Sequence, residues 1–235
     1  PLKTSEKNFS EQFYTPWNNS LSEPWEQWLG IINDFTASLA KLFNAKQSEF
    51  CPQINLSSGL TKILMSLDRA QSKNCVILVS EIDFPGMGFA LKKSLPEDCE
   101  IRFIPSNIDI TNASVWDEYL TKDVDLVFVS HAYSNTGQLS PISQVLSMAR
   151  SRNIISILDI AQSVGIVPID LKALNPDFMI GSSVKWLCGG PGAAYLWVNS
   201  DRLASCNPKD VGWFSHENPF EFDIHNFRYH DSALK

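Results

Sequence analysis

Short apolar runs, rich in β-branched side chains and separated by helical patterns, constrain the fold of this chain more than any other feature. The runs are Val76 to Val79, Ile101 to Ile104, Leu126 to Val129, Ile154 to Leu158, Phe178 to Ile180 and Ala194 to Val198. The helical patterns lie at about Leu60 to Ala70, Gly86 to Ser94, Ser114 to Leu120 and Ile142 to Arg150. Continuous apolar runs are typical of strands buried on both faces of a parallel sheet. We therefore predict an α/β fold, a three-layer α/β/α sandwich with a mainly parallel sheet.

A longer amphipathic pattern precedes these runs. From Leu21 to Phe43, apolar residues recur near helical spacing, and Ser22 is a plausible N-cap. The repeated residues are Trp25, Trp28, Leu29, Ile32, Phe35, Leu39 and Leu42. We interpret this stripe as a packing face, not as a cofactor site.

Composition narrows the class of protein. A hydrophobic content of 44% is ample for a buried core, and a net charge of −7 without a basic block argues against nucleic-acid binding. The apolar runs are too short to span a bilayer, and the first residues lack an apolar signal core, so we expect a cytoplasmic location. Five cysteines without a CxxC pair predict reduced thiols, with neither a disulfide scaffold nor a structural zinc site.

Two residues at the ends of apolar runs indicate a specific cofactor chemistry. Lys185 follows the run that ends near Ile180 and precedes a glycine-rich turn at residues 189–192, and Asp159 directly follows Leu158. A lysine can hold pyridoxal phosphate as a Schiff base, and a carboxylate beside the pyridinium nitrogen keeps the ring an electron sink. Each residue alone is commonplace, the lysine in a solvated loop and the aspartate at a strand end.

The sequence around these two residues resembles the class V aminotransferase family of pyridoxal-phosphate enzymes. The resemblance is carried by residues 131–138 (HAYSNTGQ), 159–165 (DIAQSVG) and 181–192 (GSSVKWLCGGPG), and it extends from about Pro52 to Phe222. It implies the large domain of a fold type I enzyme, pyridoxal 5'-phosphate as the cofactor, an amino acid as the substrate and a homodimer. Within it, Lys185 carries the cofactor and moves the substrate Cα proton, and Asp159 stays ionised.

The same resemblance divides the chain. Residues 1–45 are expected to form an N-terminal helical segment and residues 46–222 the cofactor-binding large domain. Residues 223–235 are expected to be the start of a smaller C-terminal domain, which holds the arginine for the substrate carboxylate in the family and which we interpret as missing here.

Further site residues follow from helix physics and from the family pattern. Ser57, Ser58 and Gly59 begin a predicted helix, where free N–H groups and the helix dipole favour a phosphate, although a plain capping serine explains them too. Phe84 follows a predicted strand, where it can stack on the pyridine ring. The resemblance implies further contacts: Ser182 or Ser183 with the phosphate, Asn135 and Gln162 with the phenolic oxygen of the cofactor, and Trp213 or His216 with the substrate. We expect no metal site, because His131 lacks partner ligands.

Departures from the family pattern limit the prediction of activity. Kynureninases carry tyrosine before the lysine and histidine at the position of Gln162, whereas this chain has Val184 and Gln162; desulfurases carry histidine before the lysine. Phe84-Pro85 favours a kynureninase-like site. We predict transamination or a lyase or hydrolase step on an amino acid; the alternative is a truncated, non-catalytic protein that binds the cofactor or a partner. A nicotinamide-dependent dehydrogenase is disfavoured because the chain has no G-x-G-x-x-G turn.

Overall fold

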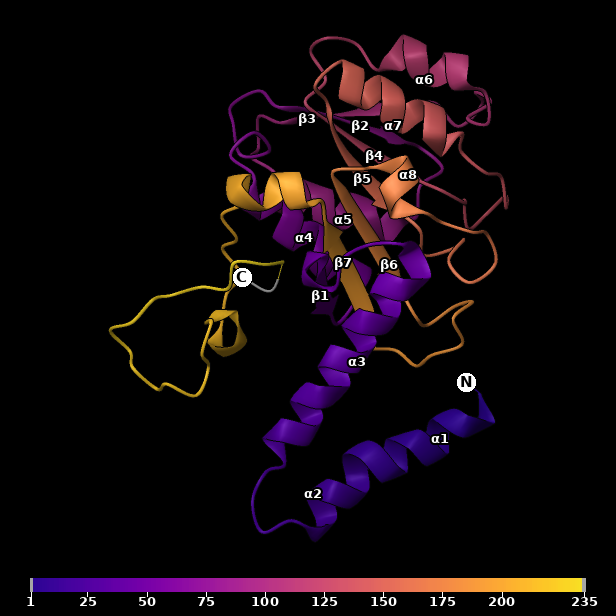
Figure 1. Ribbon diagram of the computed structural model, residues 1–235. Helices are drawn as coiled ribbons and strands as arrows, with labels where there is room; N and C mark the ends of the chain where they lie inside the picture. Colours follow the sequence, from indigo (N-terminus) through magenta and orange to yellow (C-terminus); the bar gives the residue numbers. More distant parts are fainter. Residues whose placement is uncertain (1, 234–235) are drawn as a thin grey trace.

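A seven-stranded sheet with helices on both faces forms the body of the chain in the computed structural model, which describes residues 2–233 (Figure 1). The strands are β1 (Phe50–Gln53), β2 (Val76–Ser80), β3 (Glu100–Ile104), β4 (Leu126–Ser130), β5 (Ile155–Asp159), β6 (Phe178–Ser182) and β7 (Ala194–Val198). Their order across the sheet is β1-β7-β6-β5-β4-β2-β3, and only β7 runs antiparallel to its neighbours. The predicted α/β/α sandwich with a mainly parallel sheet is confirmed.

Strand β1 is the strand that the sequence pattern did not predict. It contains Pro52, and a proline normally argues against a strand because it cannot donate a hydrogen bond to the sheet. The structure resolves the conflict, because β1 lies at the sheet edge and pairs only with β7. All six predicted apolar runs are strands, with boundaries shifted by at most two residues.

Helices cover both faces of the sheet and enclose two apolar cores. They are α3 (Trp25–Phe43), α4 (Leu56–Ser66), α5 (Pro85–Ser94), α6 (Ala113–Tyr119), α7 (Ile142–Ser151) and α8 (Leu171–Leu174), with the short η2 (Gln47–Glu49) before β1. Buried residues of α4 and α5 form one core with one face of the sheet, and those of α3, α6, α7 and α8 form the other core. Alternate residues of each central strand enter the two cores, as in Ile77 and Leu78 of β2, which explains the continuous apolar runs.

Helix α3 differs from the prediction at its start. The helix begins at Trp25, and the N-cap residue is Pro24, whose side chain can accept no hydrogen bond, so Ser22 is not the cap. The helix ends at Asn44 in a left-handed conformation (φ 54°), which is a common way to terminate a helix. The buried residues Leu39 and Phe43 join the core beside the sheet.

The N-terminal residues form one nearly continuous helix, α1 (Lys3–Phe9), η1 (Ser10–Tyr14) and α2 (Thr15–Asn19). The middle portion is wound as a π-helix, and Pro16 follows it directly. A proline within a helix removes one hydrogen bond and crowds the carbonyl of the preceding turn, so local rewinding before it is expected. Figure 1 shows this helix apart from the sheet, and Phe13 stacks on Trp28 of α3 with ring centroids 5.3 Å apart.

The last part of the chain contains little regular structure. After η3 (Ser200–Ser205) and η4 (Trp213–Ser215), the segment to residue 233 runs beside the sheet and extends away from it in Figure 1. Residues 206–222, which we expected within the large domain, therefore add no strand to the sheet. The domain boundaries at residues 45 and 222 stay predictions.

One expectation about the cysteines is wrong. Cys75 and Cys99 form a disulfide, with Cα atoms 4.7 Å apart, whereas we expected reduced thiols. The reason is the strand register: Val76 pairs with Glu100 in the parallel strands β2 and β3, so the residues just before these strands lie side by side. A spacing of 24 residues in sequence gives no sign of this contact. Cys51, Cys188 and Cys206 carry free thiols.

Within residues 2–233, no helix combines the length and the apolar character that a membrane span requires. In the same part of the chain, no three His, Cys, Asp or Glu side chains gather closely enough to hold a metal ion.

Candidate active site

The candidate site lies along the edge where the parallel strands end. Residues Ser80, Ser130, Asp159 and Ser182 are the last residues of β2, β4, β5 and β6, and all four are buried. Ligands in open α/β sheets bind outside this edge, because the loops that follow the strands gather there.

Lys185 lies three residues beyond the end of β6, in an exposed turn closed by a hydrogen bond from the Cys188 N–H to the Lys185 carbonyl (3.0 Å). The loop folds back on β6 through the Gly189 N–H, which donates to the Ser183 carbonyl at 2.8 Å. A Cβ at residue 189 would lie 2.5 Å from Ser183 Oγ, so this close approach requires glycine. The ammonium group of Lys185 lies 5.7 Å from the centroid of the Phe84 ring, within range of a cation–π contact.

Asp159 is buried, with 8% of its surface exposed, and only part of its hydrogen-bonding capacity is used. Oδ1 accepts the Ala161 N–H at 2.8 Å, and no donor among the described residues meets Oδ2. Burial raises the pKa of this carboxyl to about 6, against the lowering effects of the Ala161 hydrogen bond and of the Lys185 charge. The site thus holds a buried acid with an open oxygen, which is suited to a cationic N–H of a ligand.

The helix start predicted to bind phosphate reaches the same edge. Strand β1 runs parallel to β6, so the turn after Gln53 brings the start of α4 beside the ends of the central strands. Asn55 caps the helix by accepting the Ser58 N–H at 2.8 Å, and the Ser58 hydroxyl donates to the Asn55 carbonyl at 2.8 Å. Gly59 packs on β6, where a Cβ would make an ordinary van der Waals contact with Ile180 Cγ2 at 3.4 Å. Among the described residues, the Ser57 hydroxyl has no hydrogen-bond partner, so it is the freer of the two serines.

The remaining predicted cofactor contacts differ in how firmly they are held. The Ser183 hydroxyl donates to the Ala193 carbonyl at 2.9 Å, and the Ser182 hydroxyl accepts the Val184 N–H at 3.3 Å. Asn135 is exposed and Gln162 is half-buried, and neither side-chain amide has a hydrogen-bond partner in the described part of the chain. Both amides follow strand ends, β4 and β5, and are therefore free to meet a ligand.

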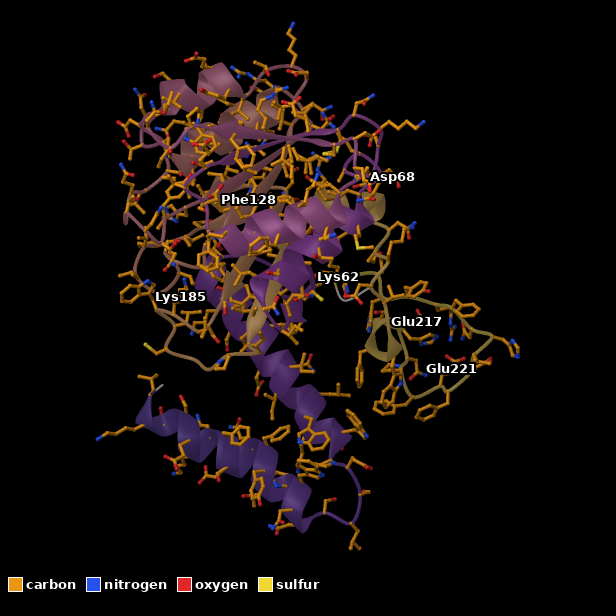
Figure 2. The ribbon with its side chains drawn as sticks, turned by 180° about the vertical axis from the view of Figure 1, so that it is seen from behind. Lys62, Asp68, Phe128, Lys185, Glu217 and Glu221 are labelled. Carbon is orange, nitrogen blue, oxygen red and sulfur yellow. A yellow bond between two sulfur atoms is a disulfide. The ribbon has the colours of Figure 1, made fainter. Side chains whose placement is uncertain are left out.

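Trp213 and His216 are not brought to Lys185 in this chain. The Trp213 ring packs on Trp25 at 5.2 Å between centroids, and its indole N–H donates to the Pro219 carbonyl. His216 accepts the Asn218 N–H at 2.9 Å through Nδ1. In Figure 2, Glu217, the neighbour of His216, lies on the opposite side of the molecule from Lys185. A contact of these two side chains with substrate stays a prediction.

The structure adds two polar residues that sequence reasoning missed, Asp83 and Tyr195, and shows the surroundings of His131. Asp83 accepts the Ser130 hydroxyl at 2.6 Å and the Ser80 N–H at 2.9 Å. Tyr195 is buried, and its hydroxyl has no hydrogen-bond partner in the described residues; burial and the nearby Asp159 charge raise its pKa. His131 is buried, and its backbone N–H donates to the backbone carbonyl of Asp159 at 2.8 Å; its side-chain Nδ1 is unpartnered among residues 2–233. The only sequence signal for Asp83 is its position between a strand and Phe84.

Comparisons with known proteins find similar sequences along most of the chain. The family model for class V aminotransferases matches residues 3–230. A kynureninase of Pseudomonas fluorescens is 27% identical over 218 residues, which is 88% of this chain and 51% of that protein. A kynureninase of Shouchella clausii is 27% identical over 204 residues, 84% of this chain and 48% of that protein. The chain thus spans about half the length of these relatives.

Solved structures share the fold. A variant of C-DES, with glycine covalently linked to its pyridoxal-phosphate cofactor, superposes with a TM-score of 0.88 at 21% identity, over 99% of this chain and 62% of that chain. A cysteine desulfurase of Thermococcus onnurineus superposes with a TM-score of 0.79 at 16% identity, over 95% of this chain and 56% of that chain.

Proposed function

The chain belongs to the class V aminotransferase family, and from this membership we propose that it is a pyridoxal-phosphate-dependent enzyme acting on an amino acid. The observation that carries the proposal is the meeting of an exposed lysine, an aromatic ring and a buried carboxyl at one sheet edge. The Lys185 ammonium lies over the Phe84 ring, and its charge lowers the pKa of the Asp159 carboxyl.

The residues present fit the cofactor. Its ring nitrogen, when protonated, is the cationic N–H that the open oxygen of Asp159 lacks, and its phosphate suits the start of α4. We assign Ser57, Ser58, Gly59 and one of Ser182 and Ser183 to the phosphate. Phe84 is assigned to the ring face, and Asn135 and Gln162 to the phenolic oxygen.

Pyridoxal phosphate, when bound, supplies an electron sink for the bonds at the substrate Cα. The other steps belong to the protein. The Lys185 amine holds the cofactor and is the group we assign to the Cα proton. Asp159, held ionised by a cationic partner, orients the ring, and Phe84 covers one face of it and excludes water.

The reaction outcome is left open between amino transfer and a lyase or hydrolase step. Phe84-Pro85 favours a kynureninase-like site, and Val184 and Gln162 depart from it. We also propose a homodimer. The exposed apolar side chains of the N-terminal helix, among them Phe9 and Trp17, support a buried position for this helix in an assembly, and the sedimentation rate of the purified chain tests it. A cytoplasmic location stays a prediction, which the Cys75–Cys99 disulfide makes worth testing by counting thiols in the freshly isolated protein.

The test of the proposal is loading with the cofactor. The purified chain with added pyridoxal phosphate should show a visible absorption band, and borohydride should fix the cofactor on the peptide that contains Lys185. The Lys185→Ala variant is the control, and it should remain unlabelled. Label on another lysine, or equal label in the variant, would contradict the assignment. Product analysis with kynurenine and a panel of amino acids then separates the reaction outcomes.

A further inference from the structure

Asp83 occupies a position that its sequence context does not explain. It lies in the turn between β2 and α5, where Ser80 and Asp83 hydrogen-bond reciprocally: the Asp83 N–H donates to the Ser80 carbonyl at 3.0 Å, and Asp83 Oδ2 accepts the Ser80 N–H at 2.9 Å. Its other oxygen, Oδ1, accepts the hydroxyl of Ser130 at 2.6 Å. Since Ser130 ends the neighbouring strand β4, one carboxyl group ties the turn to two strands.

The residue after Asp83 is Phe84, and packing does little to hold its ring. The Phe84 side chain is 55% exposed, and the residue is the N-cap of α5 without a side-chain cap. The position of the ring over Lys185 is therefore set by the backbone turn that carries it. Because Asp83 fixes that turn, it acts on the distance between the ring and the Lys185 amine.

The chemical setting of Asp83 differs from that of an ordinary surface carboxylate. No lysine or arginine of the described residues forms an ion pair with Asp83. The titratable groups that interact with it electrostatically are Asp159 and Tyr133. Burial raises its pKa to about 7, although the hydrogen bonds from Ser130 and Ser80 lower it, and the Asp159 charge adds to the increase. Both protonation states are thus populated near neutral pH.

We propose that Asp83 is a positioning residue of the site: its carboxylate, held by the Ser130 hydroxyl and the Ser80 N–H, fixes the turn that places the Phe84 ring over Lys185. The ionised form accepts both donors. When a proton occupies Oδ1, Ser130 must accept instead of donate, and its own proton then needs another acceptor. We call the contacts of the Asp83 carboxylate with Ser130 and Ser80 the clamp, and this clamp should loosen as the pH falls below about 7. The consequence for cofactor binding rests on the proposed function; the clamp itself does not.

The first experiment needs no cofactor. In the chain labelled with ¹³C at the lysine ε-carbons, the signal of the Lys185 ε-CH₂ protons, assigned from its loss in Lys185→Arg, should be displaced upfield by the Phe84 ring. Phe84→Leu should abolish the displacement, and Asp83→Asn and Ser130→Ala should remove at least half of it. Ser130→Thr keeps the hydroxyl and should retain it. In the wild type the displacement should follow a titration near pH 7, which Asp83→Asn should eliminate.

A matched control is Asp109→Asn. Asp109 also accepts a hydroxyl and an N–H, both from Thr111 (2.7 and 3.0 Å), but in an exposed turn after β3. This variant should leave the Lys185 signal unchanged. A full displacement in both Asp83→Asn and Ser130→Ala, or none in the wild type, overturns the clamp, and neither result bears on whether the chain binds pyridoxal phosphate.

The second experiment is a double-mutant cycle on the dissociation constant of pyridoxal phosphate. Asp83→Asn should weaken binding by about 3- to 10-fold in the wild-type background, a size typical of one aromatic contact, and by less than 2-fold in Phe84→Leu. Equal effects in both backgrounds would show that Asp83 does not act through Phe84. If the wild type binds no cofactor, the proposed function fails, and the lysine signal still decides the clamp.

Discussion

The carboxylates at the two ends of the parallel strands differ in whether they form ion pairs. At the edge where the strands begin, Asp125, just before β4, pairs with Arg69 at 2.9 Å. Asp177, just before β6, pairs with Arg202 at 2.6 Å. Both carboxylates also accept backbone N–H groups, from Val76 and Ser156, at 3.0 and 2.7 Å respectively.

At the edge where the strands end, Asp83 and Asp159 meet only neutral donors in the described residues, and burial raises the pKa of both. Lys185, the nearby cation, is attached to an exposed turn and forms no ion pair with any residue from 2 to 233. Asp125 and Asp177 thus pair with arginines, whereas Asp83 and Asp159 form no ion pair with the described residues. Such unmet polarity costs stability and persists where function uses it.

The largest expected effect separates the edges by function. Asp159→Ala should weaken cofactor-dependent turnover roughly 100-fold or more, because a buried charge pair with the ring nitrogen is lost, at a cost of about 2–5 kcal/mol. Asp177→Ala, measured in parallel at a temperature where it is folded, should keep turnover within about 3-fold. Wild-type turnover in Asp159→Ala would remove the electron-sink role.

For the free energy of unfolding, we expect the larger loss at Asp177 and not at Asp159. Asp177→Ala leaves Arg202 unpaired and the Ser156 N–H without its acceptor, so the free energy of unfolding should fall by about 3 kcal/mol in urea denaturation. Asp159→Asn should keep or increase the stability of the cofactor-free chain, because it removes an unpaired buried charge. If both variants lose stability equally, the contrast between the edges is wrong.

The pH dependence sharpens the same contrast. The Asp159 pKa is raised from 3.8 to about 6, so the folded chain binds more protons than the unfolded chain across that window. The contribution of the Asp159 carboxyl to the free energy of unfolding is therefore fully present below its pKa in the unfolded chain, and it is lost as the pH rises through about 6. Between about pH 5 and about pH 8, the cofactor-free wild type should lose roughly 1–2 kcal/mol relative to Asp159→Asn. A flat difference between the two chains contradicts the shift.

The last comparison concerns packing near the end of β6. A Cβ on Gly181 would lie 2.6 Å from the Tyr195 ring, so Gly181→Ala should cost about 1–3 kcal/mol of stability by overpacking. Gly88→Ala is the matched control, since nothing lies within 4 Å of its Cβ and it sits inside α5, where alanine should gain about 0.5–1 kcal/mol. A neutral Gly181→Ala, measured by thermal or urea unfolding, would mean that the ring moves freely.

Sequence reasoning succeeded where local pattern and global position agree. The buried strand β7 was predicted at its observed bounds, Ala194–Val198, because an apolar run buried on both faces needs no further information. Sequence reasoning also identified Lys185 and Asp159 as residues that follow apolar runs, and these runs are β6 and β5. It failed at β1, where a proline concealed an edge strand, and at the Cys75–Cys99 contact, which depends on the register of two strands.

The sequence by itself determined the layers, the chemical types at the strand ends and the family, because periodicity and residue order are local properties. Only the tertiary structure decided which carboxylates have cations and which do not. Asp125, Asp177, Asp83 and Asp159 all lie beside apolar runs and look alike in sequence. Their partners Arg69, Arg202 and Ser130 come from 25 to 56 residues away along the chain. Charge pairing depends on distance in space, and the fold alone sets that distance.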